Sequence, residues 1–403
     1  MILSLVKFGI GFIIRPHSSQ RVIMKQLKTT LLATLLSLGV SLGAGSALAN
    51  SPTAQSPDFS AIQAVQLQNQ LPAKNIPYYV RNDEGERRLI AGMVLNTVAR
   101  TVDTGGYYEM MTWTGGQGAG LPLHRYPESH QAFYVLEGTV EFWLDGKRYL
   151  LGAGDYASIP PKTDMAFNFK NHRNKVLIWA TGGDVYRAMS AMGEPFDGHV
   201  QPETAKVGLT TSDTAKASQT GAIVWRGKPK ATKITKAGKT LPDGVKPYVL
   251  ASGEGERYLA GDQLFIYLGN AKTSNGQFLA LITEGPKGEF VPPHFHAEHT
   301  EIFYPVIGRV NMIGNQETLQ AYPHDSVHIP AGTIHSYQMA DHYTKFIGFL
   351  TPAVFDGFFR TLGDPYDGYV YPQKPGKLRF DRVLERIDEM DLHLAKPDQK
   401  PAE

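Results

Sequence analysis

One pattern of residues occurs twice in this chain, and each matched pair of positions is separated by 170 residues. The matches are Pro77-Tyr78 with Pro247-Tyr248, EGERRL (84–89) with EGERYL (254–259), Ala132-Phe133-Tyr134 with Ile302-Phe303-Tyr304, Gly138 with Gly308, and GEPFDG (193–198) with GDPYDG (363–368). A constant period of self-similarity is the signature of a repeated structural unit. The sequence therefore predicts two tandem copies of one domain, over residues 72–205 and 242–378.

Three further segments lie outside the two copies. Residues 50–71 form an N-terminal arm, and residues 206–241, rich in Lys, Thr, Ala and Gly, are predicted to be a partly ordered linker. The segment 379–403 is predicted to hold a short amphipathic helix over 379–391, followed by a tail. The apolar positions of that helix are Val383, Leu384, Ile387 and Met390.

The first residues resemble a targeting signal. Residues 24–49 begin with Lys25 and Lys28, continue as an apolar stretch and end in Ala47-Leu48-Ala49. This order of charge, apolar run and small residues is typical of a secretory signal peptide, so residues 1–49 are predicted to be removed, with translation starting at Met24. Because those residues carry five basic and no acidic side chains, the net charge falls from +2 to −3. The mature protein is expected to be exported to the periplasm, with no membrane segment.

Composition excludes several classes of function. The chain contains no cysteine, which rules out disulfides, thiolate metal sites and a cysteine nucleophile. Its 40 basic and 38 acidic residues form no dense basic stripe, so nucleic acid is not an expected partner. We expect a monomer or homodimer that binds small molecules.

Within each copy, short alternating apolar segments are separated by turn residues. The segments 132–151 and 301–321 are examples, with Asp145-Gly146 and Gly314-Asn315 as the hairpin turns. Many short strands in units of this size predict an all-β fold, with each copy a sandwich or jelly roll.

The second copy contains a set of metal-ligating residue types. His294 and His296 are two residues apart, so on a strand both rings lie on the same side. A short turn then leads to Glu301, and a later turn after Pro330 leads to His335. Three imidazoles and one carboxylate suit one divalent transition metal (Fe, Mn, Ni, Co or Cu), with open positions for other ligands.

These residues match the two motifs of the cupin superfamily. The first runs from Gly288 to Gly308 with the spacing G-x5-H-x-H-x4-E-x6-G, and the second is P-x-G-x2-H from Pro330 to His335. The second motif normally starts with glycine, and His324 stands at that place. We expect His299 and His324 to be solvent-facing and outside the site.

The first copy keeps the turn positions of these motifs but not the ligands. Subtracting 170 from each ligand position gives His124, Tyr126, Gln131 and Met165. One imidazole with an amide and a thioether is a poor site for a hard divalent ion. The first copy is therefore expected to be a structural half, or a pocket for an organic ligand. Glu128 and His130 are turn residues that are not expected to rebuild a site.

The whole mature chain resembles the bacterial quercetin 2,3-dioxygenases. The resemblance rests on P-Y-x5-E-G-E-R near the start of each copy and on HYTK and FFRTLGDPYDG near the end of the second. It implies two tandem cupin jelly-roll domains and an enzyme that cleaves a flavonol ring with O2 and releases carbon monoxide. It also implies that His294, His296, His335 and Glu301 bind the metal and that Glu301 acts as the catalytic base. Loss of the ligands in the first copy and an exported location depart from the enzymes resembled most.

Four residues are expected to contact a flat aromatic substrate. Strand alternation predicts that Phe303, Tyr337 and Met339 share the inward face with Glu301 and His335, and that Phe349 joins them. Two alternatives stay open. One is a metal-cupin enzyme that acts on a small organic acid, as oxalate oxidases and decarboxylases do, which would need an arginine in its pocket; Arg309 is near, but is expected to face outward. The other is an exported, non-catalytic binding protein.

Overall fold

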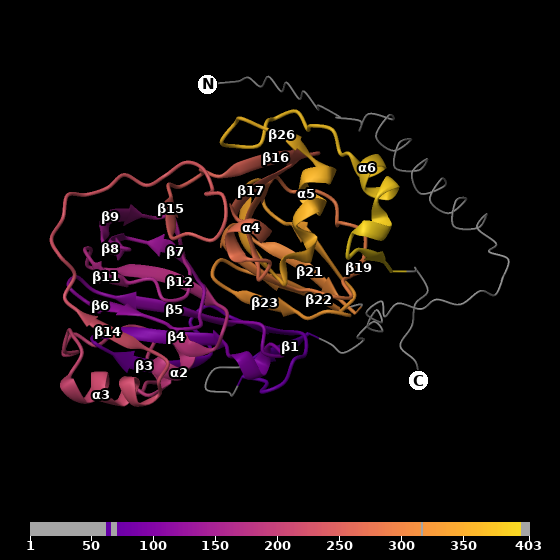
Figure 1. Cartoon of the computed structure of the whole chain (residues 1–403). Coiled ribbons are helices and arrows are strands. Elements are labelled where there is room, and N and C mark those ends of the chain that lie inside the picture. Colours follow the sequence, from indigo (N-terminus) through magenta and orange to yellow (C-terminus); the bar gives the residue numbers. More distant parts are fainter. Residues whose placement is uncertain (1–61, 66–70, 316, 396–403) are drawn as a thin grey trace, which may run out of the picture. The chain divides into compact units, whose positions relative to one another are not determined.

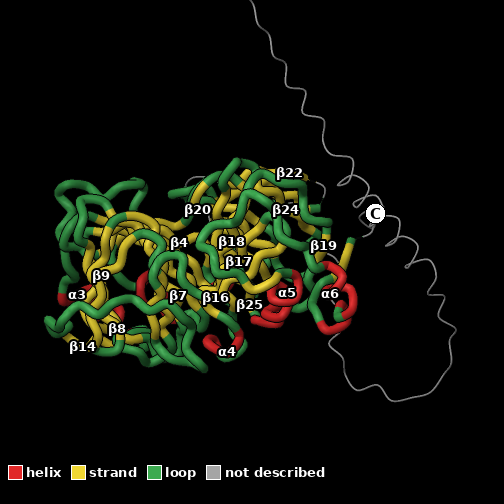
Figure 2. Tube along the Cα trace, turned by 90° about the horizontal axis from the view of Figure 1, so that it is seen from above, coloured by secondary structure: helices red, strands yellow, loops and turns green. Residues whose placement is uncertain are grey.

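The computed structural model describes residues 62–65, 71–315 and 317–395, all within a unit that spans Ala54–Glu403. The predicted signal segment 24–49 lies outside the described residues, as does most of the arm 50–71. Strands predominate and the helices are short (Figure 2), which confirms an all-β fold of two tandem jelly-roll domains with a short C-terminal helix. No helix in the described ranges is long and apolar enough to cross a membrane.

The two halves are drawn in different colours in Figure 1, indigo to magenta for the first and orange to yellow for the second. After β1 (Gln63–Val65), the first half contains β2 (Tyr78–Val80), β3 (Glu86–Ile90), β4 (Met93–Ala99), η1 (Thr101–Asp103), β5 (Glu109–Gly115), β6 (Gly120–Arg125), β7 (Gln131–Glu137), β8 (Thr139–Leu144), β9 (Lys147–Gly152), β10 (Tyr156–Ile159), β11 (Met165–Phe169), β12 (Asn174–Ala180), α2 (Asp184–Ser190) and β13 (Glu194–Pro195). The predicted turn Asp145-Gly146 joins β8 to β9, with both residues at positive φ.

The second half repeats this order of elements. It contains β15 (Tyr248–Leu250), β16 (Glu256–Ala260), β17 (Gln263–Gly269), α4 (Ala271–Ser274), β18 (Leu279–Gly285), β19 (His294–Phe295), β20 (Thr300–Ile307), β21 (Val310–Gly314), β22 (Glu317–Ala321), β23 (Ser326–Ile329), β24 (His335–Met339), β25 (Thr344–Thr351), η2 (Ala353–Phe355), α5 (Asp356–Leu362) and β26 (Asp364–Pro365).

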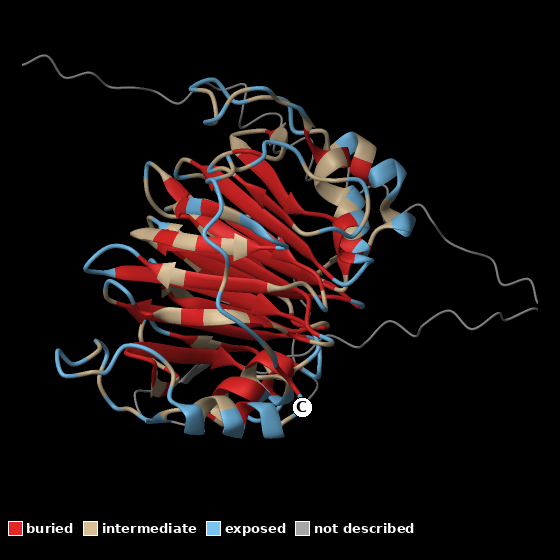
Figure 3. Ribbon diagram, turned by 60° about the vertical axis from the view of Figure 1, so that its left-hand side comes forward, coloured by how far each residue is buried: buried red, intermediate tan, exposed pale blue. Residues whose placement is uncertain are grey.

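Each half is built from one large and one small sheet. The first half has the orders β13-β3-β4-β5-β12-β7-β10-β15 and β14-β6-β11-β8-β9, where β14 is Val224–Gly227. The second half has the orders β1-β2-β23-β20-β25-β18-β17-β16-β26 and β22-β21-β24-β19-β27, where β27 is His393–Leu394. The central strands of the large sheets are buried on both faces, as the red strands of Figure 3 show. In β12, for example, Val176 and Ile178 enter the core inside the first half, whereas Leu177 and Trp179 enter a core shared with the second half. Burial on both faces explains why these strands are nearly continuous apolar runs.

The halves exchange their first strands. β2 of the first half pairs with β23 of the second, and β15 of the second half pairs with β10 of the first. Equivalent hydrogen bonds secure both exchanges: the amide of Asn82 donates to Asp325 and the amide of Ser252 donates to Asp155, each at 2.8 Å. The halves are therefore joined by backbone pairing as well as by apolar contact.

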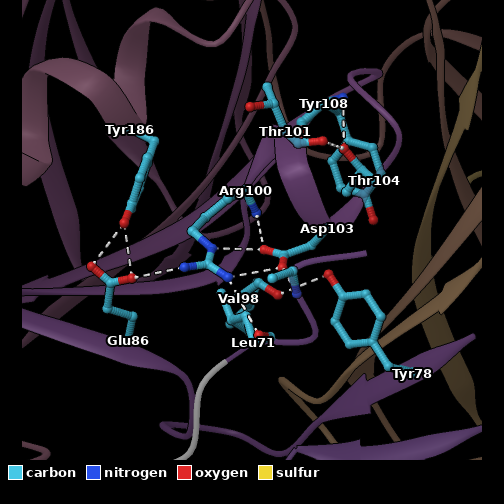
Figure 4. A network of polar contacts seen from close by, with 11 residues as sticks. Leu71, Tyr78, Glu86, Val98, Arg100, Thr101, Asp103, Thr104, Tyr108 and Tyr186 are labelled. Carbon is cyan, nitrogen blue, oxygen red and sulfur yellow. Dashed lines mark hydrogen bonds and ion pairs between the residues drawn. The ribbon is translucent and has the colours of Figure 1, made fainter. Parts of the chain in front are cut away.

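A buried ion pair anchors the chain just before β2 (Figure 4). Asp103 is fully buried, and the guanidinium of Arg100 donates two hydrogen bonds of 2.9 Å to its carboxylate. The same carboxylate accepts the amide of Ala73 at 2.7 Å, and Arg100 also donates to the carbonyl of Leu71 at 3.3 Å. Because a paired buried charge holds its partners in place, this network fixes where the exchanged strand β2 begins.

The predicted linker is more ordered than expected. It contains α3 (Thr211–Gln219), which begins with a capping box between Thr210 and Asp213, and β14 (Val224–Gly227), which pairs with β6. The C-terminal segment has the same plan, with α6 (Phe380–Glu385), η3 (Ile387–Glu389) and β27 (His393–Leu394), which pairs with β19. The Lys-rich composition of the linker did not indicate α3 and β14, which belong to the repeated unit.

The prediction of one helix over 379–391 is wrong in extent. The α-helix ends at Glu385, because Arg386 leaves helical geometry at φ −127° and ψ 20°, and a short 3-10 turn follows. Of the four apolar positions, Val383 alone is fully buried, and Leu384 is exposed.

The shared core predicts a large loss of stability for Trp179→Ala. Trp179 is fully buried and stacks on Phe349 of the second half, with ring centroids 5.1 Å apart and planes at 4°. Removing so large a buried side chain should lower the free energy of unfolding by about 3–5 kcal/mol in urea titrations. The exposed control Leu150→Ala should change it by less than about 0.5 kcal/mol. Equal effects of the two variants would contradict a shared core.

His328 predicts how stability changes with pH. Its ring lies between the halves, bonded to the Tyr108 hydroxyl at 2.7 Å and the Asn75 side-chain oxygen at 2.9 Å, and burial lowers its pKa to about 3. Below pH ~6.5 the unfolded chain binds a proton there and the native chain does not, so this stabilisation is complete above that pH and declines as pH falls. His328 should thus lower the free energy of unfolding by about 1.4 kcal/mol for each unit by which the pH falls between pH 6.5 and 4.

Urea unfolding at several pH values measures this slope. The free energy of unfolding of His328→Gln should fall with decreasing pH less steeply than that of the unsubstituted protein, by about 1.4 kcal/mol per pH unit. The exposed control His342→Gln should show the same pH dependence as the unsubstituted protein. An unchanged slope in His328→Gln would refute the assignment.

Candidate metal centre

Three strands of the second half bring the predicted ligands together. His294 on β19 pairs directly with His335 on β24, and their ring centroids are 4.4 Å apart. His296 follows β19 on the same side of the chain, 5.0 Å from the ring of His294. Glu301, near the start of β20, completes the cluster because the turn after β19 returns the chain beside the histidines.

Glu301 lies against the imidazoles. Its Oε2 is 3.1 Å from Nε2 of His335, and its Oε1 is 3.4 Å from Nε2 of His296. Glu301, His296 and His335 are all buried, whereas His294 is half-buried. Solvent therefore reaches this set of residues on the His294 side.

The rings are held in one tautomer by backbone carbonyls. Nδ1 of His294 donates to Pro292 at 2.8 Å, Nδ1 of His335 donates to Thr333 at 3.0 Å, and Nδ1 of His296 donates to Asp391 at 2.5 Å. A carbonyl accepts and never donates, so each Nδ1 carries the hydrogen and each Nε2 presents a lone pair to the cluster. This is the usual preparation of a metal-binding histidine.

The charges of the cluster are mutually adjusted. Burial lowers the pKa of His294 well below its usual value, helped by His335 and His296, and burial lowers the pKa of His296 to about 4. Burial alone would raise the pKa of Glu301, but the neighbouring imidazoles outweigh it and hold that pKa well below its ordinary value. At neutral pH, His294 and His296 are therefore neutral and Glu301 is ionised, the forms that bind metals.

The donor set fits a divalent transition metal. The ligand atoms of His294, His296 and His335 all lie within 4.8 Å of one another. Nε2 of His296 is buried without a hydrogen-bond partner among the described residues, and a bound cation would satisfy it. Imidazoles with one carboxylate suit Mn, Fe, Co, Ni and Cu alike, so the geometry does not select among them.

The expectation for His299 is wrong. Its side chain is buried beside the cluster, with Nε2 3.5 Å from Oε1 of Glu301 and its ring 4.0 Å from that of His296. Position 299 is two residues before Glu301, so strand alternation indicates that the two side chains point to the same side of the chain. Its other partner, Asp391, is too distant in the sequence to have been recognised.

His324 lies outside the cluster but is not freely exposed. It is half-buried, and its ring stacks on Tyr304 at 6.0 Å. Its φ of 73° is in the left-handed region, which agrees with its place where the motif normally has glycine.

The first half contains no equivalent donor set among its described residues. His124, Tyr126, Gln131 and Met165 are all buried, and the Gln131 amide donates to the Met165 sulfur at 3.7 Å. Nδ1 of His124 bonds to the carbonyl of Pro122 at 2.7 Å, as Nδ1 of His294 does to the carbonyl of Pro292 at 2.8 Å. The frame thus survives as packed core.

The two turn residues of the first half have structural partners instead. Nε2 of His130 bonds to the Ser158 hydroxyl at 2.8 Å, and its ring packs against Phe278 of the second half. The amide of Glu128 donates to Asp184 at 2.7 Å. Both groups of residues in the described ranges that could hold a metal lie in the second half.

Three of the four predicted substrate residues lie in one apolar group near the cluster. Phe303, Tyr337 and Met339 share the core inside the second half, and the Phe303 ring is 6.2 Å from His335 and 5.6 Å from Tyr337. Phe303 and Met339 are buried, so Tyr337, which is half-buried, is the most accessible of the three. Its hydroxyl donates to Gln263 at 2.7 Å.

The placement of Phe349 on this face is wrong. Phe349 pairs with Ile302 across the sheet, whereas Glu301 pairs with Leu350. Paired residues share a face, so Phe349 points into the core between the halves, where it stacks on Trp179. The register between β20 and β25 determines which face Phe349 lies on, and alternation along a single strand does not reveal that register.

The chain is similar in sequence to several known proteins. The family described as Cupin domain matches residues 110–181. Quercetin 2,3-dioxygenase of Bacillus subtilis (strain 168) is 40% identical over 329 residues, which cover 81% of this chain and 98% of that protein. Quercetin 2,3-dioxygenase of Aspergillus japonicus is 30% identical over 130 residues, 30% of this chain and 37% of that protein. Among solved structures, oxalate decarboxylase from Bacillus subtilis matches with a TM-score of 0.47 and 13% identity, covering 70% of this chain and 78% of that chain.

The asymmetry between the halves predicts close to one metal ion per chain. Elemental analysis of the purified protein should give about one equivalent, because within residues 62–65, 71–315 and 317–395 the second half alone combines clustered imidazoles with a carboxylate. The double variant His296→Ala/His335→Ala should lose the ion, whereas His124→Ala should retain it. Two equivalents per chain, or an ion that survives the double substitution, would contradict the assignment.

Proposed function

Because the chain belongs to the bicupin family that includes the bacterial quercetin 2,3-dioxygenases, we propose that it is a metal-dependent dioxygenase that opens a flavonol ring with O2 and releases carbon monoxide. The observation that carries the proposal is the position of Glu301, whose carboxylate lies 3.1 Å from His335 and 3.4 Å from His296. A carboxylate beside three imidazoles can serve both as a ligand and as a base.

Glu301 is proposed to accept the proton of the substrate's 3-hydroxyl group. Its lowered pKa keeps it ionised at neutral pH, so it is ready to take that proton. A divalent ion held by His294, His296, His335 and Glu301 would supply positive charge for the resulting oxyanion and for O2. The imidazoles, fixed through Nδ1, keep this arrangement rigid.

Aromatic side chains support a flat substrate. Phe303, Tyr337 and Phe346 pack together beside His335, with ring centroids 5.4 to 5.6 Å apart. We propose that Tyr337, half-buried at the edge of this group, contacts the substrate directly, while Phe303 and Met339 form the wall behind it. The half-buried His294 marks the side from which the substrate enters.

A reaction on a small organic acid has less support. Such a substrate needs a cationic side chain in the pocket, and Arg309 is the candidate nearest to the motifs. Arg309 instead binds Asp341 through its Nε at 3.1 and 3.2 Å, and it donates to Gln320 at 3.1 Å. With its guanidinium engaged in this way, Arg309 has no role at the cluster.

Export to the periplasm is a separate proposal that rests on the sequence of residues 24–49. The absence of cysteine is compatible with export, because a chain without cysteine folds independently of redox conditions.

Glu301→Gln separates the base from the ligand role. The amide keeps the size of the side chain and an oxygen ligand but cannot take the proton, so turnover measured as O2 uptake with quercetin should fall by ~10²–10⁴. Metal content should fall much less. His335→Ala should lower metal content and turnover together. Near-native turnover in metal-loaded Glu301→Gln would refute the role of Glu301 as the catalytic base. If the metal-loaded unsubstituted protein took up no O2 with any flavonol, the proposed dioxygenase activity would be refuted.

A further inference from the structure

The C-terminal segment closes over the ligand-bearing turn through Asp391. Its buried carboxylate accepts three backbone amides in succession, from Ala297 at 2.6 Å, Glu298 at 2.9 Å and His299 at 3.0 Å. Its backbone carbonyl accepts Nδ1 of His296 at 2.5 Å. A single residue of the C-terminal segment thus holds the whole turn between β19 and β20.

Asp391 also fixes the ring of His299. Nδ1 of His299 lies 2.7 Å from Oδ2 of Asp391, and a carboxylate that accepts leaves the hydrogen on Nδ1. Phe355 packs against this ring and the ring of His296, with both centroid distances 4.8 Å. The ring is therefore locked, with Nε2 directed at Glu301.

Nε2 of His299 is unsatisfied. The atom is buried without a hydrogen-bond partner among the described residues, and its 3.5 Å separation from Oε1 of Glu301 is at the limit of such a bond. An orphaned buried nitrogen is costly unless something binds it. A carboxylate–histidine pair with a free Nε2 is the arrangement that presents histidine to a metal.

The ligand atoms of His296, His299 and Glu301 lie within 4.8 Å of one another, as do those of His294, His296 and His335. We propose that His299 is an additional ligand of the metal centre, a fourth imidazole oriented by Asp391 as a positioning residue. The two three-donor sets share His296, and binding of one ion by both sets would draw their ligand atoms closer together. The assignment holds whatever the substrate is.

The first half provides an internal contrast. Position 299 corresponds to Ser129 there. Trp225 on β14 pairs with His124 as Leu394 on β27 pairs with His294, which makes Ala222 the counterpart of Asp391. The half without the ligand set therefore also lacks both members of the His299–Asp391 pair.

Pulsed EPR of the full-length protein loaded with Cu(II) alone tests the proposal by counting coordinated imidazoles. Four imidazoles in the unsubstituted protein support it, and three overturn it. His299→Ala should lose one imidazole signal and weaken Cu(II) binding by at least about 10-fold in a chelator competition. The matched control His342→Ala removes an exposed histidine of the same half and should change neither.

Asp391→Asn tests the positioning role. It should weaken Cu(II) binding by about 10–100-fold while four imidazoles remain. Asp388→Asn makes the same change of charge at an exposed position three residues earlier and should bind as the unsubstituted protein does. Equal affinities of the two variants would refute the role of Asp391. Both readouts are independent of turnover, so their failure is distinct from failure of the dioxygenase proposal.

Discussion

Exchange of first strands between the halves is the constraint on which the rest of the structure depends. β2 and β15 each complete the large sheet of the other half, and the two large sheets then bury their outer faces against each other. Successive residues of β20 therefore face opposite sides of the sheet. Phe303 lies in the core inside the second half, on the same face as Glu301, and Ile302 and Phe349 lie in the core between the halves.

This arrangement gives the half without the ligand set a structural role. Its positions equivalent to the ligands, such as Gln131 and Met165, are packed as core, yet its strands still pair with and cover the sheet that carries Glu301. The ion pair of Arg100 and Asp103 anchors the chain ahead of β2 and has no charged equivalent at the matching positions Asn270 and Thr273, which form a neutral capping box. The halves have thus diverged in polar chemistry while they retain one backbone plan.

Much of the fold could be predicted from the sequence, because the information is local or periodic. The 170-residue offset revealed the duplication, Asp145-Gly146 revealed a hairpin, and the histidine spacing brought His294, His296, Glu301 and His335 into one group. What could not be predicted depends on contacts between distant segments. The sequence alone predicts His299 at the surface, because its partner Asp391 is 92 residues away. It predicts Phe349 on the same face as Glu301, because the sequence of one strand does not determine its register with the neighbouring strand.

We propose that one metal ion is held in the second half by histidines whose Nε2 atoms lie close together beside Glu301. X-ray diffraction from crystals of the metal-loaded protein, recorded on both sides of the metal's absorption edge, locates this ion. We expect one anomalous peak per chain, about 2.0–2.1 Å from the Nε2 atoms of His294, His296 and His335. A peak beside His124 in the first half, or a peak elsewhere in the second half, would contradict it.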